Sequence, residues 1–123
     1  MTQNNETKVL TPEQIENNKQ QIIDIYRNCV KREGSDKLLD YLINKSDFFT
    51  APASTRFHGA YDGGLAHHSL NVYKCFKAYL ERDRVRELYN LNASDETIAV
   101  CALLHDICKV NVYTRGTRNV KNE

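Results

Sequence analysis

Apolar residues between Thr11 and Lys31 recur at intervals of three, four and seven, the spacing of an α-helix with one buried stripe. The members of this stripe are Ile15, Ile22, Tyr26, Cys29 and Val30. Thr11 suits the N-cap, Pro12 suits the first helical position, and Gln14 can complete a capping box. We therefore expect a helix that begins at Pro12 and ends at about Lys31.

A second, shorter helix is expected after Gly34, because glycine ends a helix readily and Ser35 can cap the next one. Its apolar residues are Leu38, Leu39, Leu42 and Ile43. From Ser46 to Gly64 the helical spacing is lost, and proline and glycine exclude a long regular helix. This segment is rich in aromatic residues, and we expect it to be an ordered loop.

A third helix is expected from about Leu65 to about Arg82, followed by a short helical turn within residues 84–91. The apolar stripe of the third helix contains Leu65, His68, Val72, Cys75 and Tyr79. Because His68 belongs to this stripe, it is predicted to face the core. Its neighbour His67 is rotated by about 100° around the helix and is predicted to face water.

A fourth helix is expected to begin after Ser94 and to end near Lys109, and its segment from Thr97 to Leu104 carries no charge. Helical spacing aligns the residues of one face, which are Ile98, Cys101, Ala102, His105 and Cys108. Asp106 lies at the flank of this face. An unpaired carboxylate costs several kcal/mol to bury, so the His105–Asp106 pair is expected to meet a cation, an ion-pair partner or a metal.

Two inward-facing histidines and an adjacent aspartate form a mixed nitrogen and oxygen ligand set. Neutral imidazole and carboxylate suit Mn, Fe, Co, Ni or Zn ions, and Mg is also compatible. Two alternatives stay open. Each histidine can be a core residue bonded to a carbonyl or carboxylate. Alternatively, His105 can be stabilised by the dipole at a helix C-terminus while Asp106 bonds a nearby arginine.

The residues after Lys109 are polar and basic, with Arg115, Arg118 and Lys121 in a short tail. Val110 to Tyr113 alternate in a way that favours one β-strand or hairpin. Because the tail has one aromatic residue, a solvated segment is favoured over a nucleic-acid platform. The fold class predicted from these patterns is all-α, a helical bundle with a short strand near its C-terminus.

The length, net charge and composition of the chain exclude several classes of protein. A chain of 123 residues is long enough for one domain with one core. Seventeen Lys and Arg against sixteen Asp and Glu leave a net charge of +1, which gives no global electrostatic case for binding nucleic acid or a membrane surface. No apolar stretch approaches the roughly 20 residues of a membrane span, and the first residues are too polar for a signal peptide. A cytoplasmic location is therefore expected.

The four cysteines are Cys29, Cys75, Cys101 and Cys108. Each occurs singly within an expected helix, which favours reduced thiols in the core. Cys101 and Cys108 are seven residues apart and would share a helical face, so a cysteine metal site is a less favoured alternative.

The sequence GGLAHHSL at residues 63–70, followed by His105-Asp106 and then Lys109, resembles the HD-domain superfamily of metal-dependent phosphohydrolases. The similarity runs from about Phe48 to Lys121. The loop TAPASTRFHGAYDGGL is similar to that of the bacterial and phage branch. The resemblance implies a helical HD bundle, a divalent metal, and hydrolysis of a nucleotide or phosphodiester.

The resemblance also implies roles for particular residues. It assigns His68, His105 and Asp106 as metal ligands, with Asp106 also orienting water. It places Lys109, and less firmly Arg56 and His58, near the phosphate, where they would stabilise developing negative charge. The alternatives are an ordinary cation near a helix C-terminus for Lys109, and hydrogen bonds that shape the loop for Arg56 and His58.

The family's fourth ligand, an aspartate on a later helix, has no counterpart before Glu123. We therefore expect residues 1–123 to form a single partial HD domain whose activity is impaired. Its expected parts are N-terminal helices at 1–47, an ordered loop at 48–64, metal-ligand helices at 65–109 and a basic tail at 110–123. Two other functions stay open: a degenerate HD domain that binds nucleotide or nucleic acid without turnover, and an assembly module whose incomplete core is covered by a second copy or a partner chain.

Overall fold

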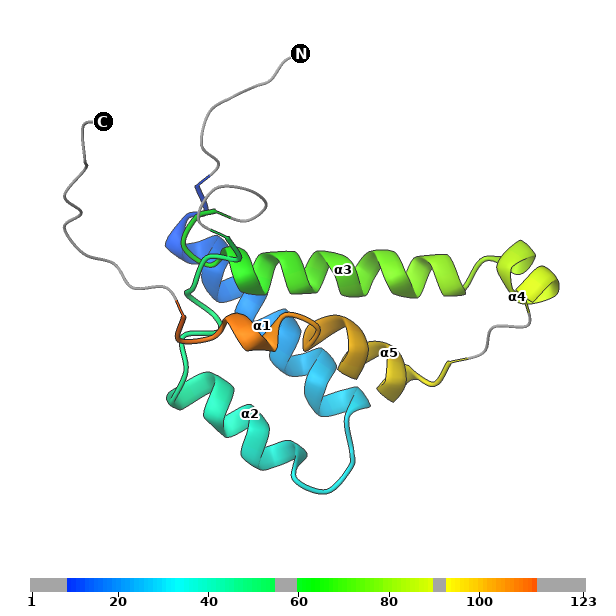
Figure 1. Cartoon of the computed structure of the whole chain (residues 1–123), viewed down its shortest axis with the longest axis horizontal. Coiled ribbons are helices and arrows are strands. Elements are labelled where there is room, and N and C mark those ends of the chain that lie inside the picture. The colour runs from blue at the N-terminus through cyan, green and yellow to red at the C-terminus, as the bar shows by residue number, and fades with distance from the viewer. Residues whose placement is uncertain (1–8, 55–59, 90–92, 113–123) are drawn as a thin grey trace, which may run out of the picture.

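The computed structural model describes residues 9–54, 60–89 and 93–112. In these ranges the chain forms helices α1 (Pro12–Cys29), α2 (Ser35–Asn44), α3 (Gly64–Leu80), α4 (Asp83–Tyr89) and α5 (Asp95–Leu103), and the short 3₁₀ helix η1 (Ile107–Lys109) (Figure 1). The described ranges contain no β-strand, which confirms the all-α prediction.

Helix α1 begins as its sequence predicts. The Gln14 backbone N–H donates to Thr11 Oγ1 at 3.1 Å, and the Thr11 backbone N–H donates to Gln14 Oε1 at 2.9 Å. These reciprocal hydrogen bonds form the predicted capping box, and they satisfy two N–H groups that have no partner inside the helix. The helix ends at Cys29, slightly earlier than predicted.

Helix α2 begins at Ser35, directly after Gly34. Gly34 has a φ of 87°, in the left-handed region that favours glycine, and it is the N-cap. The prediction that Ser35 would be the cap is therefore wrong by one residue. The apolar face is as predicted, because Leu39 and Leu42 are buried and Leu38 and Ile43 pack against the core.

Helix α3 packs against α5, and α1 packs against both. The buried face of α3 contains Gly64, Leu65, Ala66, Ser69, Leu70, Tyr73 and Leu80. The predicted stripe is therefore rotated from the true one, because Cys75 and Tyr79 are exposed and Val72 is only partly buried. Figure 1 shows the end of α3 extending toward α4, away from α1 and α2.

Helix α5 is shorter than predicted. Ser94 caps it by accepting the Thr97 backbone N–H at 3.0 Å, but the helix ends at Leu103 rather than near Lys109. The buried residues of α5 are Ile98, Ala99, Ala102 and Leu103. His105 and Asp106 thus lie in the turn between α5 and η1.

The loop after α2 contributes Phe48 and Phe49 to the core, with their rings in an edge-to-face contact at 5.0 Å between centroids. These aromatic residues of the loop therefore belong to the core. Its backbone also joins α3, because the N–H groups of Gly63 and Leu65 donate to the carbonyls of Thr50 and Ala51, each at 2.9 Å.

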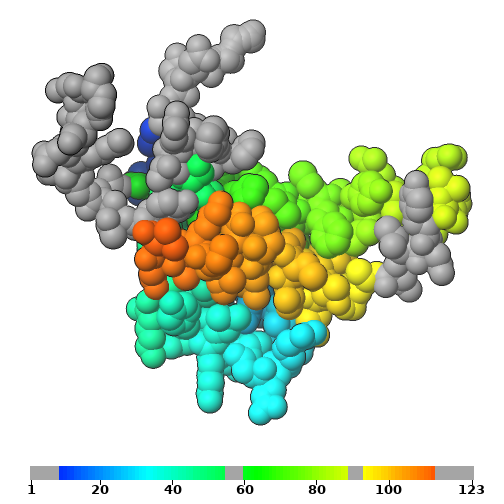
Figure 2. Space-filling model, viewed as in Figure 1, coloured from blue at the N-terminus to red at the C-terminus, as the bar shows by residue number. Residues whose placement is uncertain are grey.

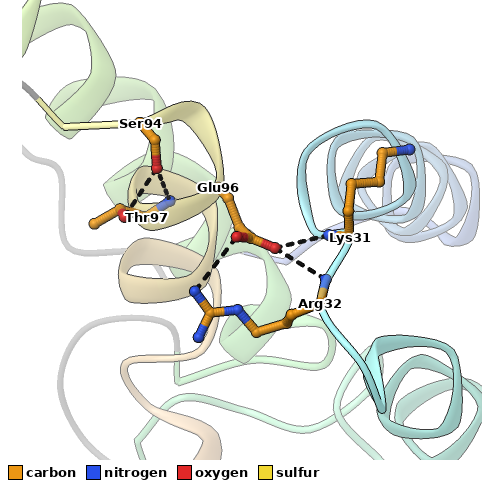
Figure 3. A network of polar contacts seen from close by, with 5 residues as sticks. All are labelled: Lys31, Arg32, Ser94, Glu96 and Thr97. Atoms are coloured by element: carbon orange, nitrogen blue, oxygen red, sulfur yellow. Dashed lines mark hydrogen bonds and ion pairs between the residues drawn. The ribbon is translucent and has the colours of Figure 1, made fainter.

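Glu96, in the first turn of α5, binds the connection between α1 and α2 (Figure 3). Its Oε2 atom accepts the backbone N–H of Lys31 at 2.7 Å and that of Arg32 at 3.1 Å, and its Oε1 atom accepts the Arg32 guanidinium at 3.3 Å. These donors, led by the Lys31 N–H, hold the pKa of the Glu96 carboxyl below its ordinary value. One carboxylate therefore fixes the start of α5.

Two further predictions are wrong in the described part of the chain. Val110 to Val112 form no strand, because Asn111 turns the chain with a φ of 60°; Tyr113 lies outside the described residues. The cysteines are all free thiols, but only Cys29 is partly buried, and the other three are exposed rather than in the core. None of the described helices is long and apolar enough to span a membrane.

Candidate metal centre

The three predicted ligands lie together. His68 belongs to α3, and His105 and Asp106 follow α5. The Nε2 atom of His105 is 3.3 Å from His68 Nε2 and 3.3 Å from Asp106 Oδ2, and His68 Nε2 is 3.6 Å from the same carboxylate oxygen. Among the described residues, these side chains form a group that could hold a metal ion. Cys101 and Cys108 do not belong to it.

The ligands lie at the edge of the core rather than inside it. About a third of each histidine side chain is exposed, 31% for His68 and 33% for His105, and 21% of the Asp106 side chain is exposed. The prediction that these histidines face the core is therefore only partly right for His68, which is partly buried, and wrong for His105, which is exposed. The three side chains therefore remain partly accessible to solvent, and a site that acts on an external substrate needs such access.

Backbone geometry orients the His105 ring. Its Nδ1 atom lies 2.7 Å from the carbonyl oxygen of Ala102, near the end of α5. A carbonyl oxygen can only accept a hydrogen bond, so Nδ1 carries the proton and donates. In the neutral ring the lone pair is then on Nε2, the atom that faces His68 and Asp106. This arrangement is common for metal-binding histidines, whose other nitrogen donates to a carbonyl or carboxylate.

The spacing of the donor atoms fits a transition metal. Metal–donor bonds of about 2.0–2.2 Å place neighbouring donors roughly 3.0–3.5 Å apart around one ion. The observed separations of 3.3 to 3.6 Å are close to this range. Two imidazole nitrogens and one carboxylate oxygen are also a donor set that Mn, Fe, Co, Ni and Zn accept. The residues present therefore fit such an ion.

Lys109 borders this group from η1. Its Nζ atom donates to the carbonyl oxygen of Ala53 at 2.8 Å and lies 3.8 Å from Asp106 Oδ2. The lysine thus joins the loop after α2 to the carboxylate of the ligand group. Figure 2 shows the segment after α5 at the surface, between α3 and α2.

The other predicted phosphate contacts, Arg56 and His58, lie outside the described residues, as do the basic residues Arg115, Arg118 and Lys121. The described chain on either side of the first pair ends at Ser54 and resumes at Ala60.

His67 does not simply face water, contrary to prediction. It is partly buried, and its Nδ1 atom lies 2.7 Å from the hydroxyl of Tyr61. Burial raises the pKa of Tyr61 above its ordinary value, so the phenol keeps its proton and forms a hydrogen bond with Nδ1. Sequence reasoning missed Tyr61, because its contact depends on how the loop returns to α3.

No family model and no solved structure matches this chain. The dihydroneopterin 2',3'-cyclic phosphate phosphodiesterase of Methanocaldococcus jannaschii is 40% identical to it over 65 residues. The matched segment makes up 53% of this chain and 25% of the relative, so the match spans about a quarter of the relative's length. Part of this chain is therefore similar to a phosphodiesterase.

Proposed function

We propose that this chain carries the metal centre of an HD-type phosphohydrolase that acts on a nucleotide or another phosphodiester. The observation that carries the proposal is the convergence of His68 Nε2, His105 Nε2 and Asp106 Oδ2 within 3.3 to 3.6 Å of one another. The partial similarity to a cyclic phosphate phosphodiesterase supports the same reaction class.

In this proposal His68, His105 and Asp106 hold the metal. When bound, a divalent ion supplies Lewis acidity toward a phosphoryl oxygen and activates water at neutral pH. The reaction adds water to phosphorus and breaks one P–O ester bond, so a diester gives a monoester and an alcohol. His105 contributes a fixed Nε2 lone pair because its Nδ1–H is held by Ala102. Asp106 supplies the negative charge of the ligand set and is proposed to orient the attacking water.

Cations beside the ligands are proposed to bind the phosphate. The Lys109 ammonium lies 3.8 Å from Asp106 Oδ2, close enough to stabilise negative charge that develops next to the ligand group. Arg56 and His58, which lie outside the described residues, are proposed to contribute as well. Since the relative's name specifies a 2',3'-cyclic phosphate, a five-membered cyclic phosphodiester is the first substrate class to test.

The test is hydrolysis of 2',3'-cyclic AMP and of bis(p-nitrophenyl) phosphate by the purified chain with added Mn²⁺, Fe²⁺, Co²⁺ or Ni²⁺. We expect metal-dependent release of monoester that is lost in His68→Ala and His105→Ala. Activity that is unchanged in His105→Ala would remove the proposed site. Metal-independent binding of nucleotide without hydrolysis would instead favour a binding module.

A further inference from the structure

Asn111 and Asp47 form a reciprocal pair between the segment after η1 and the loop after α2. The backbone N–H of Asn111 donates to Asp47 Oδ1 at 2.6 Å, and the backbone N–H of Asp47 donates to Asn111 Oδ1 at 3.2 Å. The Asn111 side-chain amide also donates to the hydroxyl of Tyr41, on α2, at 3.0 Å. Asn111 therefore anchors its own segment to two others that are distant in sequence.

The backbone at Asn111 is unusual. Within the described ranges it is the non-glycine residue with positive φ, at 60°. Most residues with a Cβ atom are destabilised in this left-handed region, and asparagine is among the few that adopt it, because its short side chain bonds locally. Such conformations persist where surrounding contacts fix them, and they cluster at functional sites. At Asn111 those contacts are the hydrogen bonds to Asp47 and Tyr41.

Hydrogen bonds continue from Asp47 to the helix that carries His68. The Asp47 carbonyl accepts the backbone N–H of Ala51 at 2.7 Å, and the Ala51 carbonyl accepts that of Leu65 at 2.9 Å. Leu65 lies in the first turn of α3, three residues before His68. Asn111 is also close in sequence to the other two ligands, because only the single turn of η1 and Val110 separate it from Asp106. The pair thus links the two chain segments that supply the ligands.

We propose that Asn111 is a positioning residue for the metal centre: by holding Asp47, it fixes the turn of His105 and Asp106 against α3 and so sets their distance from His68. This inference rests on the proposed function of the same site. The hydrogen bonds described for Asn111 go to Asp47 and Tyr41 and not to a ligand side chain, so its side chain acts on the ligands indirectly, by fixing the chain segments that carry them. Residues that hydrogen-bond metal ligands from outside the ligand set contribute about 10–100-fold to metal affinity, and Asn111, which acts one step further away, is expected at the lower end of this range.

The test measures Co²⁺ affinity by titration, following the visible absorption bands of the bound ion, together with thermal unfolding of the metal-free protein. Asn111→Gly keeps the left-handed conformation accessible but removes the side chain. We expect it to weaken Co²⁺ binding about 10-fold or more and to change the band shape, because the ligands lose their fixed spacing. Asn44→Gly is the matched control, since Asn44 Nδ2 bonds Asp40 Oδ1 at 2.8 Å on α2, and its Co²⁺ affinity should stay unchanged.

Exchanging the side chains of Asp47 and Asn111 gives a second, independent test by Co²⁺ affinity. Asn111→Asp alone places a second carboxylate beside Asp47 and should weaken Co²⁺ binding. The double variant Asp47→Asn with Asn111→Asp restores one charge and one amide, with an oxygen on each side to accept the backbone N–H of the other. It should recover most of the affinity. If Asn111→Gly does not fold, this comparison decides the question by itself.

Loss of thermal stability with unchanged Co²⁺ affinity and spectrum would overturn the inference and leave the proposed metal centre intact. The inference also fails if the exchanged pair binds Co²⁺ no better than Asn111→Asp alone. If the unaltered chain binds no Co²⁺, the inference and the proposed function fail together.

Discussion

The Nδ1 atom of His105 donates to the carbonyl oxygen of Ala102 at 2.7 Å, which turns the Nε2 atom of the ring toward His68. Ala102 lies near the end of α5, where carbonyl groups have no partner inside the helix. Because α5 ends before His105, this residue lies outside the helix, and the carbonyl of Ala102 is available to orient its ring. This relationship makes the roles of the individual histidines testable.

Metal content should depend on His68 and His105 but not on His67, which adjoins His68 on α3. We expect His68→Ala and His105→Ala each to lower Co²⁺ or Mn²⁺ affinity at least about 10-fold, because each removes one of three donors. His67→Ala removes the partner of Tyr61 and should leave metal affinity unchanged. Elemental analysis after equilibrium dialysis measures the effect, and equal losses in His67→Ala and His68→Ala would contradict the assignment.

Gly63 should tolerate alanine less well than Gly34, although both have positive φ, 79° and 87°. A Cβ atom at Gly63 would lie 2.8 Å from Ile15 Cγ1, whereas one at Gly34 would meet nothing within 4 Å. The left-handed conformation costs about 1–2 kcal/mol with any Cβ, and crowding adds about 1–3 kcal/mol. Chemical denaturation should therefore show a larger loss of unfolding free energy for Gly63→Ala. Equal losses would mean that the Ile15 side chain moves aside freely.

Ser69 should be replaceable by alanine without loss of stability. Its hydroxyl is fully buried between α3 and its neighbours and has no hydrogen-bond partner in the described structure. Removing an unsatisfied buried hydroxyl is expected to be neutral or to stabilise by up to about 1 kcal/mol. The reverse change on the same face, Ala66→Ser, should destabilise by about 1–3 kcal/mol. A clear loss of unfolding free energy in Ser69→Ala would show that the hydroxyl has a partner after all.

The Glu96 contacts should make stability depend on pH in the acidic range. The pKa of Glu96 is lowered from 4.5, first by the Lys31 N–H and then by the Arg32 side chain, so the folded state favours the ionised carboxyl. Its contribution is fully present above pH 4.5 and is lost as the pH falls through the folded-state pKa. Glu96→Gln should therefore lower Tm at pH 7, and the gap to the unaltered protein should narrow below pH 4.5. A gap that stays constant with pH would show that charge contributes nothing.

Lys109 should matter for hydrolysis more than for folding. Lys109→Met removes the cation beside Asp106 and the hydrogen bond to Ala53. We expect the rate with a phosphodiester to fall at least about 10-fold, since groups that stabilise charge in the transition state commonly contribute that much. The control is Lys77→Met, which breaks an exposed ion pair with Glu81 at 2.8 Å. A rate loss no larger than in that control would show that Lys109 has no role in turnover.

Features that depend on residues close together in the sequence could be predicted. The start of α1 depends on Thr11 and Gln14, which lie within one turn of each other, so short-range hydrogen bonding sufficed. The grouping of His68 with His105 and Asp106 was predicted because a histidine and a carboxylate at the end of an uncharged segment need a partner, and His68 was expected to face the same core. That these residues bind a metal stays a prediction. Arg56 and His58 stay predictions, because they lie outside the described residues.

The sequence did not correctly predict which faces of α3 and α5 are buried. Helix α5 is apolar on most of its faces, so spacing alone did not reveal that Ala102 is buried while Cys101 is exposed. On α3, small residues such as Ala66 and Ser69 belong to the buried face, and the stripe drawn through larger residues missed them. Which face of such a helix is buried depends on the helices that pack against it, and the sequence of the helix alone does not show this.

Two of the polar pairs described above join segments that are far apart in the sequence. Lys31 and Glu96 are 65 residues apart, and Asp47 and Asn111 are 64 apart, so both pairs close long loops of chain. Closing such loops lowers chain entropy before any contact compensates, which makes long-range pairs late events in folding. During synthesis, the His68 helix is complete well before Asn111 emerges from the ribosome. We therefore expect the proposed metal centre to take up its ion only after the turn at Asn111 has been made.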